Sequence, residues 1–249
     1  MKLKYFRIDP GGNVTAILKG NFSKQEKIEI SKTILSLDAK IEQVGFWREP
    51  KNPQALARLE MMGGEFCGNA IRCLAYLIWQ QKGENNFFIE SSAIIDPIKV
   101  KTLSHYAKIT LPLKNFELRE VKVGSLVVVP GISHLIVNQS VSKEDVRKIL
   151  IDNGLLENKA VGVISVKKEG NRINIKPTIW VRDTKTLYEE TACASGSLAV
   201  AYFFSRLEYS HNFIIQQPSG KDFMVTIVNK RFISLGGPIL GIREKSISL

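Results

Sequence analysis

Two cysteines occupy matching positions in the two halves of this 249-residue chain. Cys67 lies in the stretch 65–70 (EFCGNA) and Cys193 in the stretch 191–196 (TACASG), and an apolar run with helical periodicity follows each of them. A helix N-terminus carries unpaired N–H groups and a partial positive charge, so it binds carboxylates and lowers the pKa of a thiol. We therefore expect each cysteine to be a reactive thiol at the start of a helix.

Two such thiols would suit an amino-acid racemase or epimerase that needs no cofactor. One thiolate would remove the α-proton, and the thiol on the opposite face of the α-carbon would deliver a proton, so that the configuration inverts. The substrate carboxylate would accept hydrogen bonds from backbone amides at both helix starts, and these would stabilise its developing negative charge. The expected amide donors are those of Gly68, Asn69, Ala194, Ser195 and Gly196.

Other roles for the cysteines also have to be weighed. A free cysteine is ordinarily a small buried apolar side chain, and we assign that role to Cys73. For Cys67 or Cys193 alone that role would be as good an interpretation as catalysis, but the paired setting favours chemistry. No paired Cys-x-x-Cys or His-x-x-x-His motif accompanies them, so we expect no metal site. A Cys–His nucleophile stays open, because the chain contains His105, His134 and His211.

Composition narrows the range of partners. The formal net charge is +11, but lysine and arginine are scattered and do not form a stripe interleaved with aromatic residues, so we expect no nucleic-acid partner. No apolar run approaches the roughly 18 residues of a transmembrane helix, so we expect no membrane partner. Three cysteines are too few for a disulfide framework, and residues 1–10 do not resemble a secretory signal, which favours a cytoplasmic protein with free thiols. No phosphate-binding loop or pyridoxal phosphate site is recognisable, so we expect no cofactor.

The elements that would position the cysteines repeat in the two halves. Each half is predicted to run through strands, a helix, more strands, the cysteine-bearing helix and final strands. The predicted helices are 23–38 (with a capping box at Ser23 and Glu26), 67–83, 142–153 and a helix from Cys193. The predicted strands are 2–8, 14–18, 43–47, 55–61, 86–91, 98–103, 107–111, 121–129, 135–138, 160–168, 172–182, 213–217, 223–228, 232–235 and 239–243. We expect a first lobe over 1–116, to which the last strand (239–249) is a candidate to return, and a second lobe over 117–238.

Two polar residues near these motifs are candidate substrate contacts. Asn13 ends a Pro-Gly-Gly-Asn segment between the first two strands, where turn chemistry is the better explanation from the residues alone. Glu65 precedes the first cysteine by two positions, and a surface carboxylate explains it equally well.

The two cysteine motifs resemble those of the diaminopimelate epimerase-like, cofactor-independent racemases. The shared motifs are Gly12-Asn13, Cys67-Gly68-Asn69 with Arg72-Cys73, Glu190 to Gly196, and Gly236-Gly237-Pro238, and they span essentially the whole chain. The resemblance implies an α/β (α+β) fold with two pseudo-symmetric lobes, each a curved, mostly antiparallel sheet around a central helix. It also implies a thiol/thiolate pair at Cys67 and Cys193, substrate contacts that include Asn13 and Glu190, and a homodimer.

Two departures argue for a substrate other than diaminopimelate. The epimerases carry Glu-Arg-Gly before the second cysteine and a Gly-Asn-Pro-His turn, whereas this chain has 180–183 (WVRD) and 131–134 (GISH). Several stretches are similar instead to the histidine racemases of the staphylopine-type metallophore pathway, namely 9–13 (DPGGN), 42–46 (EQVGF), 65–70 (EFCGNA) and 217–220 (QPSG). That similarity implies interconversion of L- and D-histidine. A diaminopimelate epimerase, a racemase of another polar or basic amino acid, and a non-catalytic metabolite-binding protein are the alternatives.

Overall fold

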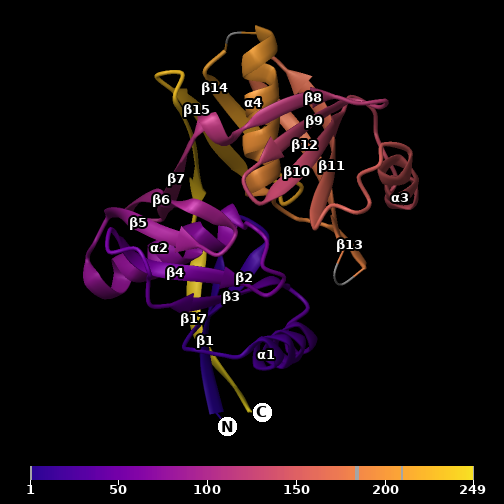
Figure 1. Cartoon of the computed structure of the whole chain (residues 1–249). Coiled ribbons are helices and arrows are strands. Elements are labelled where there is room, and N and C mark those ends of the chain that lie inside the picture. Colours follow the sequence, from indigo (N-terminus) through magenta and orange to yellow (C-terminus); the bar gives the residue numbers. More distant parts are fainter. Residues whose placement is uncertain (1, 183–184, 209, 249) are drawn as a thin grey trace. The chain divides into compact units, whose positions relative to one another are not determined.

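The computed structural model describes residues 2–182, 185–208 and 210–248. The chain divides into two compact units, a first unit of residues 1–109 with 237–249 and a second unit of residues 110–236. Each unit wraps strands around one long helix, α2 (Gly68–Lys82) in the first and α4 (Ala194–Glu208) in the second (Figure 1). A shorter helix lies on the outside of each sheet, α1 (Lys24–Leu37) and α3 (Lys143–Asp152) respectively.

The sheet of the first unit has the strand order β17-β1-β2-β3-β4-β5-β6. All neighbours are antiparallel except the pairs β2–β3 and β4–β5, which are parallel because a helix connects each of them. The strands are β1 (Lys2–Asp9), β2 (Val14–Lys19), β3 (Ile41–Arg48), β4 (Ala55–Met61), β5 (Asn86–Ser91), β6 (Ile94–Leu103) and β17 (Gly241–Ser248). β7 (Tyr106–Pro112), followed by the short 3-10 helix Leu113–Asn115, leads into the second unit.

The sheet of the second unit repeats this arrangement in the order β8-β9-β10-β11-β12-β14-β15-β16. Its two parallel pairs, β10–β11 and β12–β14, are again those that span a helix. The strands are β8 (Glu117–Glu120), β9 (Ser125–Val129), β10 (Ile132–Val137), β11 (Ala160–Glu169), β12 (Arg172–Val181), β13 (Thr186–Glu189), β14 (Asn212–Gln216), β15 (Asp222–Val228) and β16 (Phe232–Pro238). The alternation of antiparallel and parallel pairs therefore makes α4 the counterpart of α2, and α3 the counterpart of α1.

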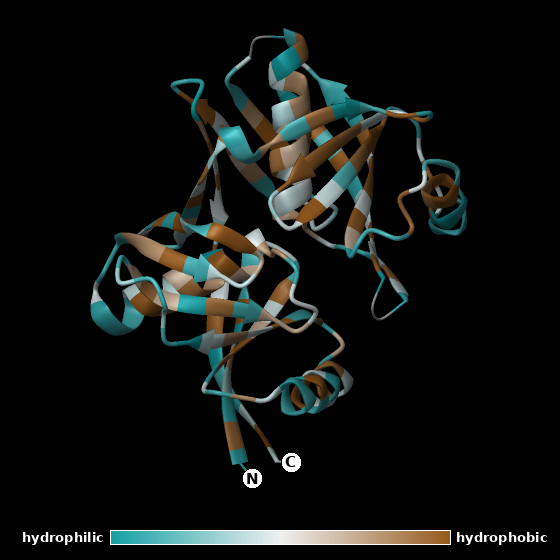
Figure 2. Ribbon diagram, viewed as in Figure 1, coloured by the Kyte–Doolittle hydropathy of each residue, from teal (hydrophilic) through white to brown (hydrophobic). Residues whose placement is uncertain are grey.

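The inner and outer helices differ in how much of their surface is apolar. Residues 68–78 of α2 are all buried, and so are residues 194–201 of α4, as expected for helices enclosed by strands. The outer helices α1 and α3 instead show one hydrophilic and one hydrophobic face (Figure 2). Ile30 and Ile34 of α1 pack on β1 to β3, and Val146 and Leu150 of α3 pack on β9 to β11. Each unit thus has an inner core around its cysteine-bearing helix and a second core under its outer helix.

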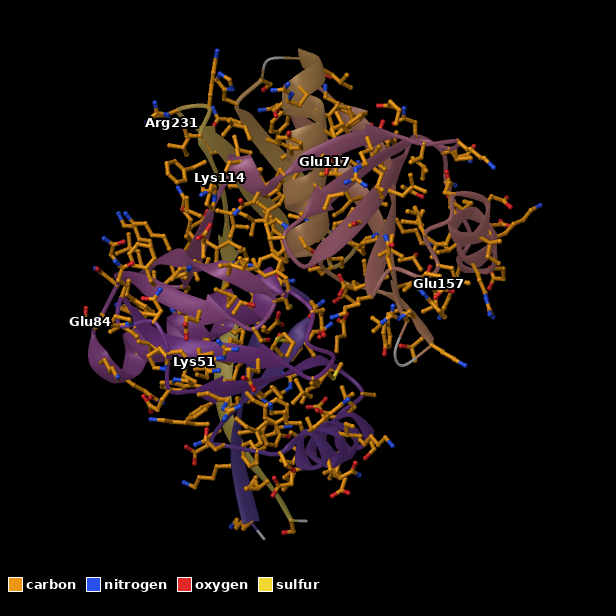
Figure 3. The ribbon with its side chains drawn as sticks, viewed as in Figure 1. Lys51, Glu84, Lys114, Glu117, Glu157 and Arg231 are labelled. Atoms are coloured by element: carbon orange, nitrogen blue, oxygen red, sulfur yellow. The ribbon has the colours of Figure 1, made fainter. Side chains whose placement is uncertain are left out.

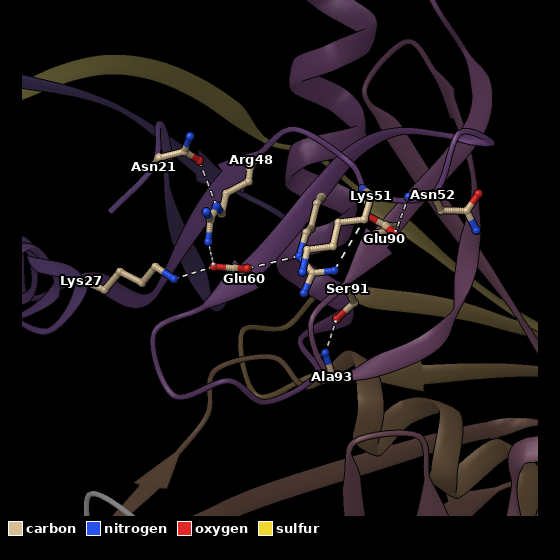
Figure 4. A network of polar contacts seen from close by, with 10 residues as sticks. Asn21, Lys27, Arg48, Lys51, Asn52, Glu60, Glu90, Ser91 and Ala93 are labelled. Atoms are coloured by element: carbon tan, nitrogen blue, oxygen red, sulfur yellow. Dashed lines mark hydrogen bonds and ion pairs between the residues drawn. The ribbon is translucent and has the colours of Figure 1, made fainter. Parts of the chain in front are cut away.

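An ion-pair cluster ties the outer helix α1 to β3 and β4 in the first unit. Glu60 on β4 accepts hydrogen bonds from Lys27 on α1, from Arg48 on β3 at 3.0 Å and from Arg58 on β4 at 3.2 Å (Figure 4). Burial would by itself raise the pKa of Glu60, but the three cations outweigh burial and lower this pKa to about 2. The Glu60 carboxyl is therefore ionised over the neutral pH range.

Elsewhere, exposed side chains of both signs are distributed over the two units. Figure 3 labels Lys51 and Glu84 in the first unit, and Lys114, Glu117, Glu157 and Arg231 in the second, all of them exposed. No helix of the described residues is long and apolar enough to cross a membrane.

The predicted fold class is confirmed: the chain is a mixed, mostly antiparallel α/β protein with four α-helices among the described residues. The capping box predicted at Ser23 and Glu26 is present, and Gly83 ends α2 in the left-handed conformation. The strand predicted over 121–129 is confirmed only over β9 (Ser125–Val129), and its first residues, 121–124, lie outside any strand. Gly124 turns the chain there at φ +81°, where an added Cβ would lie 2.1 Å from a backbone oxygen of β10, so β8 and β9 form a hairpin.

Candidate active site

Cys67 is the N-cap residue of α2. Its φ of −126° and ψ of 103° are those of an N-cap, and its Sγ accepts a hydrogen bond from the Ala70 backbone N–H at 3.4 Å. Serine, threonine and aspartate usually occupy this position, where a side-chain acceptor satisfies one of the unpaired N–H groups of the first turn. The sequence thus places a half-buried sulfur where an anion is stabilised by the helix N-terminus.

Arg72 is fully buried in the first turns of α2 and holds the surroundings of Cys67 together. Its guanidinium donates to Asn69 Oδ1 at 3.0 Å and to the backbone oxygens of Ala107 (3.0 Å), Pro10 (3.2 Å) and Pro238 (2.9 Å). Burial lowers the pKa of Arg72 to about 10, so the side chain stays charged at neutral pH. Negative charge on Cys73, Tyr106 or Cys67 would oppose that lowering, because each of these groups lies close enough to attract the guanidinium.

Asn13 lies in the loop that Arg72 joins to α2. Asn13 is buried and has φ +56°, and Gly11 and Gly12 before it donate backbone N–H groups to Asp9 Oδ1 at 2.9 Å each. The left-handed conformation agrees with the interpretation of Asn13 as a turn residue. The loop and the start of α2 nevertheless belong to one hydrogen-bonded assembly, since Arg72 binds both.

Glu65 is half-buried, so it is not a fully solvated surface carboxylate. Its Oε2 is shielded from solvent and has no hydrogen-bond partner among the described residues. Burial raises the pKa of the Glu65 carboxyl, and the backbone amides of Glu65 and Gly63 partly oppose this rise. The carboxyl therefore has an acceptor atom that is still to be satisfied.

Cys193 is placed in the same way at the start of α4. Its Sγ accepts a hydrogen bond from the Gly196 backbone N–H at 3.2 Å, three residues on, as Cys67 does from Ala70. Ser195 Oγ lies 3.5 Å from the same sulfur. Ala194, Ser195 and Gly196 are all buried in the first turn of the helix. The predicted site residues of the second unit are thus gathered around one sulfur.

Gln217 fixes the backbone of Cys193, a role that the sequence did not reveal. Its Oε1 accepts the Cys193 backbone N–H at 2.9 Å, while its Nε2 donates to Ser197 Oγ at 2.9 Å and to the Ile215 backbone oxygen at 3.0 Å. Ser197 Oγ in turn donates to the Cys193 backbone oxygen at 2.6 Å. Gln217 begins the stretch 217–220 (QPSG), whose sequence indicates a family resemblance but not this contact.

The expectation of a lowered thiol pKa is wrong for Cys193 in this state. Burial raises the pKa of Cys193 well above its ordinary value, and the charge and hydrogen bond of Glu190 raise it further. Hydrogen bonds from Ser195 and Gly196 oppose the rise without cancelling it. The partial positive charge at the start of α4 does not outweigh the loss of water around the buried sulfur. Cys193 is therefore a protonated thiol in this structure.

Of the three histidines, His134 is the one that reaches a cysteine motif. Its Nε2 lies 3.0 Å from Ser195 Oγ, so Ser195 stands between the imidazole and Cys193 Sγ. Burial lowers the pKa of His134 to about 3, which keeps the ring neutral. His105 contacts Tyr76 at 3.3 Å in the first unit, and His211 is an exposed residue. Among the described residues, no histidine ring forms a direct hydrogen bond with a cysteine sulfur as a Cys–His nucleophile would.

The described residues contain no cluster of histidine, cysteine, aspartate and glutamate that could hold a metal ion. The buried Cys73 in α2 has a thiol whose pKa burial raises to about 12, in keeping with a packing role.

Comparison with known proteins agrees with this arrangement. A family model described as the histidine racemase CntK N-terminal domain matches residues 2–234. A histidine racemase of Fusobacterium nucleatum subsp. nucleatum is 30% identical in an alignment 267 residues long, and this alignment covers 98% of this chain and 97% of that protein. A predicted epimerase from Pseudomonas aeruginosa has a TM-score of 0.71 at 12% identity and covers 98% of this chain and 99% of its own. A PhzF-family phenazine biosynthesis protein of Bacillus anthracis has a TM-score of 0.70 at 13% identity, with full coverage of both chains, 100% and 100%. At such identities the two solved structures establish the fold alone.

Proposed function

The chain belongs to the histidine racemase CntK family of isomerases, and on that premise we propose that it interconverts L- and D-histidine with Cys67 and Cys193 as its two catalytic groups. The substrate is proposed from the histidine racemase that is 30% identical over nearly its whole length. The departures from the epimerase motifs at Val181 and Ile132 favour histidine over diaminopimelate.

The observation that carries the two-cysteine mechanism is the matched setting of the two sulfurs. Each begins the inner helix of its unit, and each accepts a hydrogen bond from the backbone N–H three residues on. A buried cysteine that only packs, such as Cys73, lies inside its helix instead. An N–H aimed at sulfur stabilises the thiolate, which is the form that removes a proton.

The proposed reaction needs one thiolate and one thiol at the start of each turnover. Cys193 enters as the thiol, because burial and Glu190 hold its proton. We assign the thiolate role to Cys67, whose sulfur is less buried and accepts the Ala70 N–H, and it takes the α-proton of the enantiomer whose α-hydrogen faces it. The Cys193 thiol then gives its proton to the opposite face of the α-carbon. The opposite enantiomer requires the opposite protonation states, and exchange with solvent interconverts them.

Backbone amides at the helix starts would hold the substrate carboxylate while the α-carbon carries negative charge. Gly68 and Asn69 supply such amides in the first unit, and Ala194, Ser195 and Gly196 supply them in the second. The unsatisfied Oε2 of Glu65 supports a role as hydrogen-bond acceptor for an N–H group of the substrate. We assign Asn13 a supporting contact from the loop bound by Arg72.

The substrate is tested by incubating the reduced protein with single L-amino acids in deuterium oxide. Loss of the α-proton signal by NMR, together with chiral chromatography, reports exchange and inversion. We expect inversion of histidine and little or none of diaminopimelate or of other basic and polar amino acids. Inversion of diaminopimelate alone would make the protein an epimerase, and absence of exchange with every amino acid would support a binding protein.

The catalytic roles are tested with three matched variants. Cys67→Ser and Cys193→Ser each remove one acid–base group, so each is expected to lower kcat by about 10²–10⁴-fold. Cys73→Ser changes the third cysteine, which lies away from the helix start, and is expected to retain activity. Wild-type activity in either of the first two variants would contradict the mechanism.

We also propose that the protein is a homodimer, as the family resemblance implies. Light scattering coupled to gel filtration is expected to give twice the 27.9 kDa mass of the chain. A mass equal to that of one chain over a range of concentrations would contradict this.

A further inference from the structure

A chain of three buried polar groups leads away from the sulfur of Cys193. Ser195 Oγ lies 3.5 Å from Cys193 Sγ, and His134 Nε2 lies 3.0 Å from Ser195 Oγ on its other side. Cys193 and Ser195 are at the start of α4, and His134 is on β10, so all three belong to the second unit. Their exposed fractions are 2%, 6% and 0%, so all three groups are shielded from bulk solvent.

The surroundings of His134 fix which ring nitrogen carries the proton. Nδ1 is buried and has no hydrogen-bond partner among the described residues. It points at Gly162, the register partner of His134 on β11, where an added Cβ would lie only 2.3 Å from it. A protonated Nδ1 would bury an N–H group with no acceptor, and buried donors without a partner are rarer in proteins than under-satisfied acceptors. The proton therefore belongs on Nε2.

That tautomer fixes the direction of the remaining hydrogen bonds. Nε2–H donates to Ser195 Oγ, so the Ser195 hydroxyl hydrogen is free for the other neighbour of the oxygen, which is Cys193 Sγ. We propose that His134 is a positioning residue that holds the Ser195 hydroxyl as a hydrogen-bond donor to the Cys193 sulfur. Cys193 thiolate then receives two hydrogen bonds, from Ser195 Oγ–H and from Gly196 N–H. Only the catalytic importance of this arrangement rests on the proposed function.

His134 acts through Ser195 and does not itself accept a proton. Its side chain meets Ser195 on α4, and its register partners are Val127 on β9 and Gly162 on β11, none of which is charged. Burial lowers the pKa of His134 to about 3, in agreement with a ring that stays neutral. Around Cys193 itself, Glu190 is the charged group that opposes the thiolate, and Ser195 and Gly196 favour it. The Ser195 hydroxyl therefore lowers the pKa of Cys193, whereas Glu190 raises it.

The tautomer is tested directly in the unaltered protein. The chain has three histidines, so ¹⁵N labelling of the imidazole rings gives spectra that single His134 variants assign without ambiguity. We expect His134 to show the neutral Nε2–H pattern across the whole range in which free histidine titrates. A neutral Nδ1–H pattern, or protonation within that range, would overturn the proposal.

The action on sulfur is tested by titrating the Cys193 thiol. In a Cys67→Ser, Cys73→Ala background Cys193 is the only thiol, and NMR of the protein labelled with ¹³C at cysteine Cβ follows its thiolate without interference from the six tyrosines. Ser195→Ala is expected to raise the midpoint by about 1 pH unit, because a hydrogen bond to the charged form is lost. His134→Leu is expected to raise the Cys193 midpoint by less than Ser195→Ala does. His134→Gln keeps an N–H donor, so its midpoint is expected to lie close to that of the wild-type residue.

Coupling between the two residues distinguishes this role from a general loss of structure. In the Ser195→Ala background, His134→Leu is expected to add no further shift. Gly162→Ala, which forces the imidazole to move, is expected to resemble His134→Leu, whereas Gly241→Ala, at a glycine with open space around it, is the control. An unchanged midpoint in Ser195→Ala, or an equal His134→Leu shift in both backgrounds, would overturn the proposal. Absence of racemase activity would contradict the proposed function. The Cys193 titration would still test the role of His134, because it does not depend on turnover.

Discussion

Gln217 offers a sharp test of how the second unit positions its cysteine. Replacing it by leucine keeps the volume but removes the acceptor for the Cys193 N–H and the donor to Ser197 and Ile215. Ser197 keeps its hydrogen bond to the Cys193 backbone oxygen, so the main loss is one buried N–H left unsatisfied. Such a loss costs about 1–3 kcal/mol of unfolding free energy. We expect about 2 kcal/mol for Gln217→Leu.

The same change is expected to impair catalysis more than stability. The backbone of Cys193 loses its anchor, and a shift of the sulfur by about 1 Å is enough to lower kcat roughly 10²-fold. The assays are urea unfolding followed by tryptophan fluorescence, and the initial rate of histidine inversion. Gln216→Leu, at the half-buried last residue of β14, is the matched control and is expected to stay within about 0.5 kcal/mol of wild type.

Gln217→Glu separates position from charge. The carboxylate still accepts the Cys193 N–H, but its negative charge near the sulfur adds to that of Glu190 and is expected to raise the Cys193 pKa further. The thiol titration described above should then move to higher pH. Wild-type stability and wild-type kcat in Gln217→Leu would refute the reasoning, because the hydrogen bonds of Gln217 would then have no measurable effect.

Two further predictions concern the first unit. The pKa of Glu60 is lowered to about 2, so its ion pairs stabilise the fold above about pH 4.5, and this stabilisation is lost as the pH falls through about 2. Glu60→Gln is expected to lower the free energy of unfolding by about 1–2 kcal/mol at neutral pH, after allowance for solvent screening. Urea unfolding should show that the difference between variant and wild type is smaller at acid pH. An equal difference at neutral and acid pH would contradict a stabilising role of the ionised Glu60. Arg72→Met removes the donor to Asn69 and three backbone oxygens, so it is expected to cost about 3 kcal/mol or more and to lower kcat. Unfolding and racemisation assays check this, and a variant of wild-type stability would show that the guanidinium does not hold the loop and the helix together.

The local elements could be predicted because their signals lie within a few residues. Ser23 and Glu26 start α1, Cys67 starts α2 and Gly83 ends it, as caps and periodicity indicated. The strand β13 (Thr186–Glu189) was missed, because four residues with two exposed side chains show no clear alternation. The β8–β9 hairpin was missed for a different reason, since the contact that requires Gly124 is made with β10.

The polar framework of the site could not be predicted from local patterns. His134 meets Ser195 across 61 positions of sequence, and Arg72 meets Pro10 across 62 and Pro238 across 166. Periodicity indicates which side chains are buried but not which buried polar groups meet. The raised pKa of Cys193 was likewise hidden, because it depends on burial and on Glu190 beside the sulfur. The two cysteines themselves were recognisable because residue type and helix start coincide.

In the proposed mechanism two different sulfurs handle the proton, one on each face of the α-carbon. The most direct test follows the label at early times, starting from L-histidine in deuterium oxide. With two thiols the product is D-histidine carrying α-deuterium, while the unreacted L-histidine keeps its α-proton. If recovered L-histidine gains deuterium as fast as D-histidine forms, a single group serves both faces, and the assignment of Cys67 and Cys193 as a pair is wrong.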